Sequence, residues 1–452
     1  MAGIGWKLQK MVDRDSLAGT MSAYLTGVAV TSAPWLLTTA VLISLRIAAH
    51  ADGSPTFAMV ERIVTLVYAL TVVLSAPVHI VVSRYAADRL YDHRLDRIGA
   101  PMWRALSATL LGFLVIGLVL MKILHVPVAL GFAGVFLTVV VGGQWLLLSV
   151  AGGLASPTIV LRAFFAGCPL GLLASLWLYR GLHLGAVGYL GGFALGQLVT
   201  LAMLLHGVAR AIPDKTDETA RLWPAFAEYW LLALSAFIYY VSIWTDKAMV
   251  WLLADRETAS LYSAITAIAW FTVVPTFGWI YVQIETVFYR RFRAFYGGLG
   301  GGAPLSLLRQ RAALVTTEAM RILRGAALVQ ASVLALALVG APVIMRLVGI
   351  SAGGVLPFRL AAIGAALQLL SLLEILLLYY FDLRQEALSV SLTLLGTEAV
   401  LVLVAHFTGV TPAAAYLTAC AAAALVGLLL VRARLATLIT DTFQAQAYGD
   451  VV

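Results

Sequence analysis

Apolar stretches long enough to cross a bilayer follow one another along nearly the whole chain. A membrane-spanning helix needs about 20 mostly apolar residues, and by this criterion the pattern predicts twelve helices. They are expected at Thr20–Ala48, Phe57–Ser83, Trp103–Leu124, Pro127–Gly152, Thr158–Tyr179, His183–Val208, Ala225–Ala254, Ser260–Phe288, Gly325–Val348, Gly354–Tyr380, Glu386–Phe407 and Thr411–Val431. The hydrophobic pattern therefore predicts an all-α polytopic membrane protein.

A short polar stretch in the middle of the chain separates the first six predicted helices from the last six. It covers Ala209–Pro224 and contains Arg210, Asp214, Lys215, Asp217, Glu218 and Arg221. We therefore expect an N-terminal six-helix bundle over residues 1–208, a cytoplasmic hinge over 209–224 and a C-terminal six-helix bundle over 225–452. Two bundles of six helices joined by a hinge are typical of a transporter.

The composition agrees with a membrane protein and excludes most soluble classes. Hydrophobic residues make up 62% and charged residues 12% of the chain, against about 45–50% and about 25% in soluble domains. Both cysteines lie in hydrophobic stretches, so neither a disulfide framework nor a zinc site is indicated. The sequence lacks the HExxH, GxSxG and nucleotide-binding fingerprints. We expect no enzymatic activity, metal or cofactor.

The net charge of +8 follows the predicted topology. Most Lys and Arg residues fall on one side when both termini are cytoplasmic, as the positive-inside rule requires, so no nucleic-acid partner is indicated. Residues 1–19 lack a cleavable signal and are predicted to form an amphipathic arm at the cytoplasmic interface. The longest predicted soluble segment is Tyr289–Arg324, in which the glycine-rich run Gly297–Pro304 is interpreted as a flexible connector.

Polar side chains recur at helical spacing on three predicted helices, the first, the second and the seventh. Because unpaired polar groups are costly in hydrocarbon, we expect these faces to point inward, toward water or substrate. Together with polar residues elsewhere in the seventh and eleventh helices, they give the candidate substrate-pathway residues Tyr24, Thr31, Glu61, Tyr68, His79, Glu228, Tyr239, Asp246, Lys247 and Glu398.

Several of these residues also have a purely structural interpretation. The hydroxyl groups can bond helix backbones or neighbouring helices, His79 can be a bonded interface residue, and Asp246 with Lys247 can be a local ion pair. Glu398 lies midway along the eleventh predicted helix with no basic residue beside it. It is protonated, paired across helices or functional.

Local motifs along almost the whole chain resemble the Pel exopolysaccharide transporter family, PelG. These are Ala2–Leu8 through Ser16, Ser32-Ala33-Pro34-Trp35, Arg84-Tyr85 followed by Asp88–Tyr91, Asp246-Lys247, Ile284-Glu285-Thr286 with Phe295-Tyr296, Tyr380–Arg384 and Thr442-Phe443-Gln444. Ala33 stands where that family has glycine, so the packing or bend of the first helix is expected to differ there.

The resemblance implies the fold of the multidrug/oligosaccharidyl-lipid/polysaccharide exporter superfamily, with two six-helix bundles around a central cavity. It implies export of an N-acetylhexosamine-rich polymer from cytoplasm to periplasm for a biofilm matrix, across the inner membrane of a Gram-negative bacterium. The implied partners are a cytosolic glycosyltransferase and inner-membrane subunits that sense cyclic di-GMP, in addition to membrane lipid. Four residues in the matching motifs are cytoplasmic gate or docking candidates: Arg84, Asp88, Glu285 and Asp382.

Three other functions remain open from the sequence. A lipid-linked oligosaccharide flippase of the same fold would need a cationic cavity for pyrophosphate, whereas the polar faces found here carry carboxylates and hydroxyls. A cation-coupled drug antiporter would use Asp246 or Glu398 as its coupling carboxylate. A non-transporting membrane scaffold for a polysaccharide synthase would need neither a cationic cavity nor a coupling carboxylate.

Overall fold

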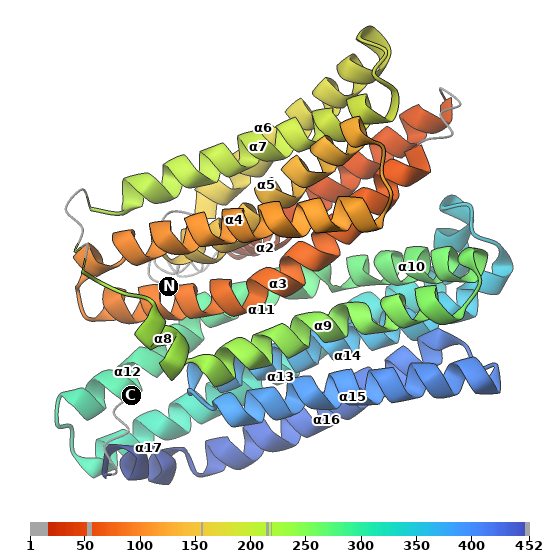
Figure 1. The fold of residues 1–452 in the computed structure, drawn as a ribbon. Helices are drawn as coiled ribbons and strands as arrows, with labels where there is room; N and C mark the ends of the chain where they lie inside the picture. The colour runs from red at the N-terminus through yellow and green to blue at the C-terminus, as the bar shows by residue number, and fades with distance from the viewer. Residues whose placement is uncertain (1–16, 52–56, 155–156, 214–216, 218, 448–452) are drawn as a thin grey trace. The chain divides into compact units, whose positions relative to one another are not determined.

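The computed structural model describes residues 17–51, 57–154, 157–213, 217 and 219–447, and within these ranges the chain forms helices and turns without a strand. The helices group into two compact units (Figure 1). Unit 1 contains Ala29–Ala233, and unit 2 contains Leu234–Val452 together with the start of the first described helix up to Val28. The all-α polytopic fold expected from the hydrophobic pattern is confirmed.

In the part of unit 1 that the structure describes there are six long α-helices and one short α-helix. They are α2 (Leu17–Ala51), α3 (Phe57–Tyr91), α4 (Gly99–Ile123), α5 (Val128–Leu154), α6 (Pro157–Leu176), α7 (Gly185–Ala211) and α8 (Trp223–Glu228). The first turns of α2 belong to unit 2. The apolar faces of these helices form one continuous core, which includes Leu45, Val67, Leu137 and Tyr189.

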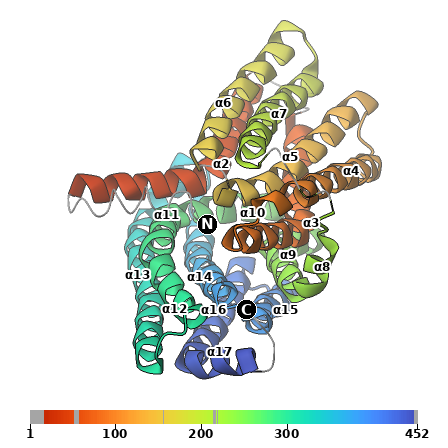
Figure 2. The ribbon, with the colours of Figure 1, turned by 90° about the vertical axis from the view of Figure 1, so that its left-hand side faces the viewer.

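The helices α6 and α7 lie side by side in both views (Figures 1 and 2) because small residues line their contact. A Cβ atom added at Gly192 would lie 2.1 Å from the backbone nitrogen of Ser175, and one added at Gly196 would lie 2.4 Å from the Cα atom of Gly171. Glycines four residues apart allow close approach of this kind between helices in a membrane. The side chain of Ser175 also donates a hydrogen bond to the carbonyl of Tyr189 at 2.9 Å.

Among the described residues, unit 2 contains the remaining helices and two hydrophobic clusters, except that the first of these helices, α9 (Trp230–Leu253), begins in unit 1, which extends to Ala233. The helices are α9 (Trp230–Leu253), α10 (Arg256–Trp270), α11 (Val274–Gln283), α12 (Tyr289–Gly300), α13 (Leu305–Leu347), α14 (Val355–Tyr380), α15 (Arg384–Thr408), α16 (Pro412–Ala436) and α17 (Leu438–Ala447). A turn of 3-10 helix over Phe271–Val273 separates α10 from α11, and Pro275 follows directly. The eighth predicted span, Ser260–Phe288, is therefore interrupted just before Pro275, a residue that cannot donate a backbone hydrogen bond within a helix.

In the described part of the chain, eleven helical segments are long and apolar enough to cross a membrane. They correspond to all the predicted spans except the seventh, which is α9. This helix has 24 residues, or about 36 Å at 1.5 Å per residue, so its length is sufficient. Its apolar sequence is interrupted by Asp246 and Lys247, which lower its hydropathy.

The interpretation of Gly297–Pro304 as a flexible connector is wrong. The helix α12 continues through Gly300, and α13 starts at Leu305, so only a tight turn separates them. The two helices pack on each other: Nη1 of Arg311 donates a 2.8 Å hydrogen bond to the carbonyl of Ala294. The missing Cβ of Gly298 leaves room for that guanidinium. The segment thus forms a helical hairpin.

Candidate functional site

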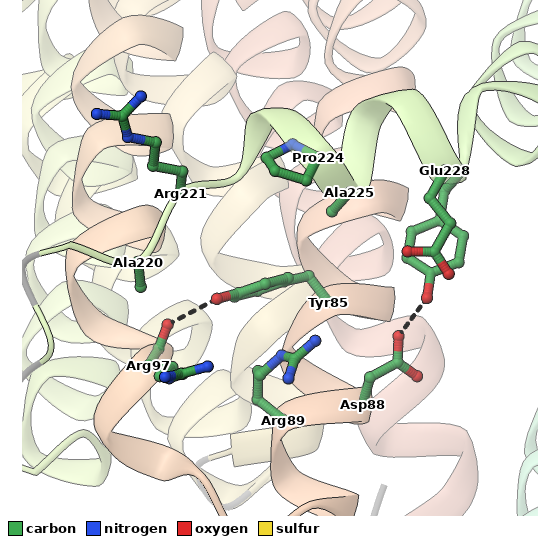
Figure 3. Close-up of a pocket in the computed structure, with 10 residues that line it drawn as sticks. Tyr85, Asp88, Arg89, Arg97, Ala220, Arg221, Pro224, Ala225 and Glu228 are labelled. Atoms are coloured by element: carbon green, nitrogen blue, oxygen red, sulfur yellow. Dashed lines mark hydrogen bonds between the residues drawn. The ribbon is translucent and has the colours of Figure 1, made fainter.

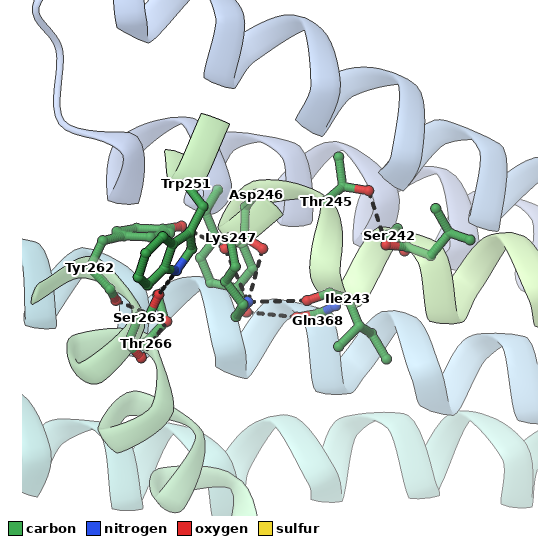
Figure 4. A network of polar contacts seen from close by, with 12 residues as sticks. Ser242, Ile243, Thr245, Asp246, Lys247, Trp251, Tyr262, Ser263, Thr266 and Gln368 are labelled. Carbon is green, nitrogen blue, oxygen red and sulfur yellow. Dashed lines mark hydrogen bonds and ion pairs between the residues drawn. The ribbon is translucent and has the colours of Figure 1, made fainter. Parts of the chain in front are cut away.

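A buried ionic cluster lies inside unit 2 around Asp246 (Figure 4). The Asp246 side chain is 0% exposed. The Lys247 Nζ lies 2.9 Å from Oδ1 and 3.1 Å from Oδ2 of this carboxylate. The hydroxyl of Tyr262, on α10, donates a 2.6 Å hydrogen bond to Oδ2. Both carboxylate oxygens are therefore satisfied, as a buried charge requires.

Helices on three sides hold the lysine in place. The Lys247 Nζ also donates a hydrogen bond to the carbonyl of Ile243 at 3.1 Å, one turn earlier on α9. It lies 5.4 Å from the ring centroid of Tyr416 on α16, within the range of a cation–π interaction. The Tyr416 hydroxyl donates a 2.6 Å hydrogen bond to Oε1 of Gln368 on α14. The pair Asp246–Lys247 is thus local, as expected, but its surroundings come from distant parts of the sequence.

A second carboxyl group, Glu398 on α15, lies close enough to this cluster to interact electrostatically with both Asp246 and Lys247. Its side chain is 0% exposed. Within the described residues, neither of its carboxyl oxygens has a hydrogen-bond partner. An ionised carboxylate without partners is very costly to bury. The negative charge of Glu398 would therefore need a bound proton or cation to balance it.

A cavity of about 190 Å³ lies in unit 1, beside the segment that leads from α7 to α9 (Figure 3). Asp88 is one of its lining residues. Nε of Arg84 lies 3.3 Å from Oδ1 of Asp88, and the hydroxyl of Tyr229 donates a 2.7 Å hydrogen bond to Oδ2. The exposed side chain of Glu228 lines the same cavity. Two gate candidates, Arg84 and Asp88, and one pathway candidate, Glu228, thus come together here.

The polar segment after α7 is attached to unit 1 by a series of contacts. The backbone nitrogen of Asp217 donates a 2.8 Å hydrogen bond to the carbonyl of Asp96, and Nε of Arg97 lies 3.2 Å from the Asp217 carboxylate. Nη1 of Arg104 donates to the carbonyl of Ala220 at 3.0 Å. Hydrogen bonds from the side chain and the backbone of Thr219 lower the pKa of the Asp217 carboxyl below its usual value. Asp217 is therefore negative at neutral pH.

The remaining pathway candidates lie on α2, α3 and α9. The hydroxyl of Tyr24 accepts a 3.2 Å hydrogen bond from Nε2 of Gln283 within unit 2. In unit 1, Glu61 pairs with Arg46 at 3.4 Å, and Tyr68 makes an edge-to-face contact with Trp145. Thr31 lies within hydrogen-bonding distance of Ser32, and His79 is half-buried. Tyr239 is buried in unit 2, where its ring meets Tyr240 edge to face. That these faces line a water-filled path stays a prediction.

The last two gate candidates lie at helix ends in unit 2. Glu285 is buried in a π-helical turn, Ile284–Phe288, between α11 and α12. Such turns are frequent at functional sites. Asp382 is in the turn between α14 and α15 with φ 57°, and it pairs with Arg384 at 2.7 Å. Their role as gates stays a prediction.

The sequence analysis missed Tyr262, Gln368 and Tyr416, which complete the cluster around Asp246 and Lys247. Gln368 and Tyr416 lie in largely apolar helices, whereas Tyr262 lies on a more polar helix. Tyr262 and Thr266 are four residues apart on α10, and both are buried. This short polar face was the one local signal available.

Two helical units and, among the described residues, eleven segments long and apolar enough to cross a membrane define a polytopic membrane protein. A family model described as "PelG: Putative exopolysaccharide Exporter (EPS-E)" matches residues 1–443. The chain therefore belongs to the PelG family. Among curated proteins, none matches it.

Solved transporter structures share the fold at low sequence identity. An outward-facing multidrug resistance MATE family transporter of the MOP superfamily has 13% identity and a TM-score of 0.67, with 95% of this chain and 96% of that chain covered. The bent form of the Vibrio cholerae MATE transporter VcmN has 12% identity and a TM-score of 0.67, with 96% and 98% covered. A MOP superfamily transporter from Pyrococcus furiosus has 14% identity and a TM-score of 0.66, with 95% and 96% covered. These similarities establish the two-lobed transporter fold.

Proposed function

We propose that this transporter exports a Pel-type, N-acetylhexosamine-rich exopolysaccharide from the cytoplasm to the periplasm of a bacterium. In this proposal it lies in the inner membrane with both termini in the cytoplasm. The observation that carries the proposal is the family match over residues 1–443. The fold of the solved transporters, found over more than nine-tenths of the chain, supports it.

A polysaccharide presents many hydroxyl groups, so its movement favours replaceable hydrogen bonds over one tight site. The hydroxyl and carboxylate side chains on α2, α3 and α9 are the groups proposed to provide them. No single hydroxyl is expected to dominate. Replacing Thr31 with alanine should therefore cost only about 1 kcal/mol of binding free energy.

The cluster in unit 2 is proposed to couple transport to cation movement. Asp246 and Lys247 neutralise each other at 2.9 Å, which leaves the Glu398 carboxyl as the group that must take up a proton or a monovalent cation. Release of that cation leaves a buried charge, and this state is unfavourable unless the helices rearrange. The same observation favours a second candidate function, cation-coupled antiport of small molecules.

The partners proposed for the export function are a cytosolic glycosyltransferase and inner-membrane subunits that sense cyclic di-GMP. The surface around the Asp88 cavity is a natural docking site because Arg89 and Arg221 also line it. The test of docking is co-purification of the partner subunits with the wild type and with the Arg221→Glu variant. Unchanged recovery with the variant would remove this surface from the proposal.

The function is tested by deleting the gene while the synthase is retained, and by measuring polymer on both sides of the inner membrane. Export requires that extracellular polymer disappears and that the wild-type gene restores it. Undiminished extracellular polymer would overturn the exporter proposal. If export persists in a Glu398→Gln strain, the protein is an exporter but the coupling role of Glu398 is wrong.

A further inference from the structure

An apolar groove of about 430 Å³ runs along unit 1 between α3, α4 and α8. Its α4 side is a single helical face, from Pro101 through Ala105, Ala108 and Gly112 to Ile116. At 1.5 Å per residue, this face is about 22 Å long. The remaining lining residues are Leu74, Ser75, Val78, Arg104, Thr109, Phe113, Leu222, Trp223 and Phe226.

Arg104, at one end of the groove, is the one charged residue among the lining residues that the structure describes. This side chain is exposed, and its Nη1 atom donates to the carbonyl of Ala220. Among the described residues, no carboxylate lines the groove. Trp223 lies on α8, within the segment that leads from α7 to α9 (hereafter the connector), and is 78% exposed. Arginine binds phosphate through its forked N–H groups, and exposed tryptophan is typical of the membrane–water interface.

We propose that this groove binds an anionic phospholipid, with one acyl chain along α4 and the phosphate at Arg104. The polarity of the groove matches that of a lipid: a cation and an interfacial aromatic ring at one end, and apolar side chains toward Ile116. Acyl chains are also the apolar molecules that surround membrane-spanning helices. The proposal is independent of the identity of the exported substrate.

The dimensions favour a narrow extended chain over a helix of another protein as the occupant. An α-helix with its side chains is about 10 Å wide, so a piece 22 Å long would fill roughly 1,700 Å³. The groove has about 430 Å³. A single extended chain fits that volume, and small residues make the space for it. A Cβ atom added at Gly112 would meet nothing within 4 Å.

The bound lipid would brace the connector. Leu222, Trp223 and Phe226 line the groove opposite the face of α4, so an acyl chain lies between α8 and the two long helices. The phosphate would reinforce the place where Arg104 already contacts Ala220. Occupancy by lipid should therefore stabilise the attachment of the connector to unit 1.

The experiment is native mass spectrometry of the purified full-length protein with added phosphatidylglycerol or phosphatidylcholine. The Gly112→Leu variant places a side chain in the groove and should retain one lipid fewer than the wild type. The Gly396→Leu variant is the matched control, because a Cβ there also meets nothing within 4 Å and Gly396 is on α15, in unit 2. It should retain lipid as the wild type does. Ala108→Leu, a second groove variant, should repeat the loss if Gly112→Leu does not fold.

Arg104 is tested separately, since it is assigned the headgroup and not the chain. Arg104→Gln should keep the bound lipid but lose preference for phosphatidylglycerol over phosphatidylcholine by about fivefold, as expected for one cation near an anionic headgroup. Equal lipid retention by Gly112→Leu and Gly396→Leu would overturn the groove as a lipid site. An unchanged preference in Arg104→Gln would overturn the anionic headgroup.

Discussion

The hydroxyl of Tyr262 donates a 2.6 Å hydrogen bond to Oδ2 of Asp246 and so joins α10 to α9 at a fully buried carboxylate. The ammonium group of Lys247, the next residue on α9, donates hydrogen bonds to both oxygens of the same carboxylate. Glu398, the other acid of the cluster, has no hydrogen-bond partner within the described residues. The two carboxyl groups therefore differ in their contacts: both oxygens of Asp246 have partners, whereas neither oxygen of Glu398 has a hydrogen-bond partner in the described part of the chain.

Replacing Asp246 with leucine should destabilise the protein by about 3–5 kcal/mol, because it leaves the Lys247 ammonium buried without its counter-ion. The double replacement of Asp246 and Lys247 by leucine should recover most of that loss, since apolar residues can substitute for a buried ion pair. Thermal unfolding in detergent measures both. Equal destabilisation by the single and double variants would contradict the pairing.

The sequence predicted the helices well because bilayer length and hydropathy are local properties. It failed for Tyr289–Arg324, where arginines and glycines read as a soluble loop. Only contacts such as that of Arg311 with Ala294 reveal the helical hairpin.

Asp246, Lys247 and Glu398 could be selected from the sequence because charge is rare inside a membrane. Their partners could not. The contacts of Tyr262 with Asp246 and of Tyr416 with Gln368 join different helices, and no periodicity encodes which helices meet. The attachment of Asp217 to Arg97 is missing from the sequence analysis for the same reason.

Replacing Glu398 with glutamine should leave stability nearly unchanged and abolish export. Glutamine has the shape of the protonated acid but cannot release a proton, so the cluster would remain in one charge state. The measurement is the amount of polymer outside the cell, divided by the amount of the transporter variant in the membrane. The control is the same replacement at another buried glutamate of unit 2, Glu374→Gln. This variant should export normally. Wild-type export by Glu398→Gln would remove this residue from coupling.

Replacing Gly192 with alanine should destabilise the protein by about 1–3 kcal/mol, the usual cost of overpacking, because the new Cβ would lie 2.1 Å from the backbone nitrogen of Ser175. Gly191 is the matched control, since the nearest atom to a Cβ there is 4.0 Å away. Gly191→Ala should behave as the wild type in thermal unfolding. Equal unfolding temperatures for the two variants would contradict the close contact of α6 with α7.

The attachment of the connector should be insensitive to moderate acid. The pKa of Asp217 lies below its usual value of 3.8, so its contribution to stability is present above that value and is lost only as the pH falls through the lowered pKa. A spin label at the exposed position of Arg221 should therefore keep its mobility between pH 7 and about 4. In the Asp217→Ala variant the label should be mobile already at pH 7. A label equally immobile in both proteins would show that Asp217 does not hold the connector.

The orientation of the chain is predicted by its basic loops and can be measured without any knowledge of the substrate. Reporter fusions at Pro213 and at Gly302 should be cytoplasmic, because arginines flank both positions. Gly302 is the better insertion point of its hairpin, since it lies in the turn between α12 and α13 with φ 66°. Fusions at Asp52 and Ser351 should be periplasmic. Pro213 follows six predicted spans, so an even number of crossings must return it to the side of the N-terminus. A periplasmic reporter at Pro213 would therefore overturn both the division into six and six helices and the cytoplasmic placement of the connector.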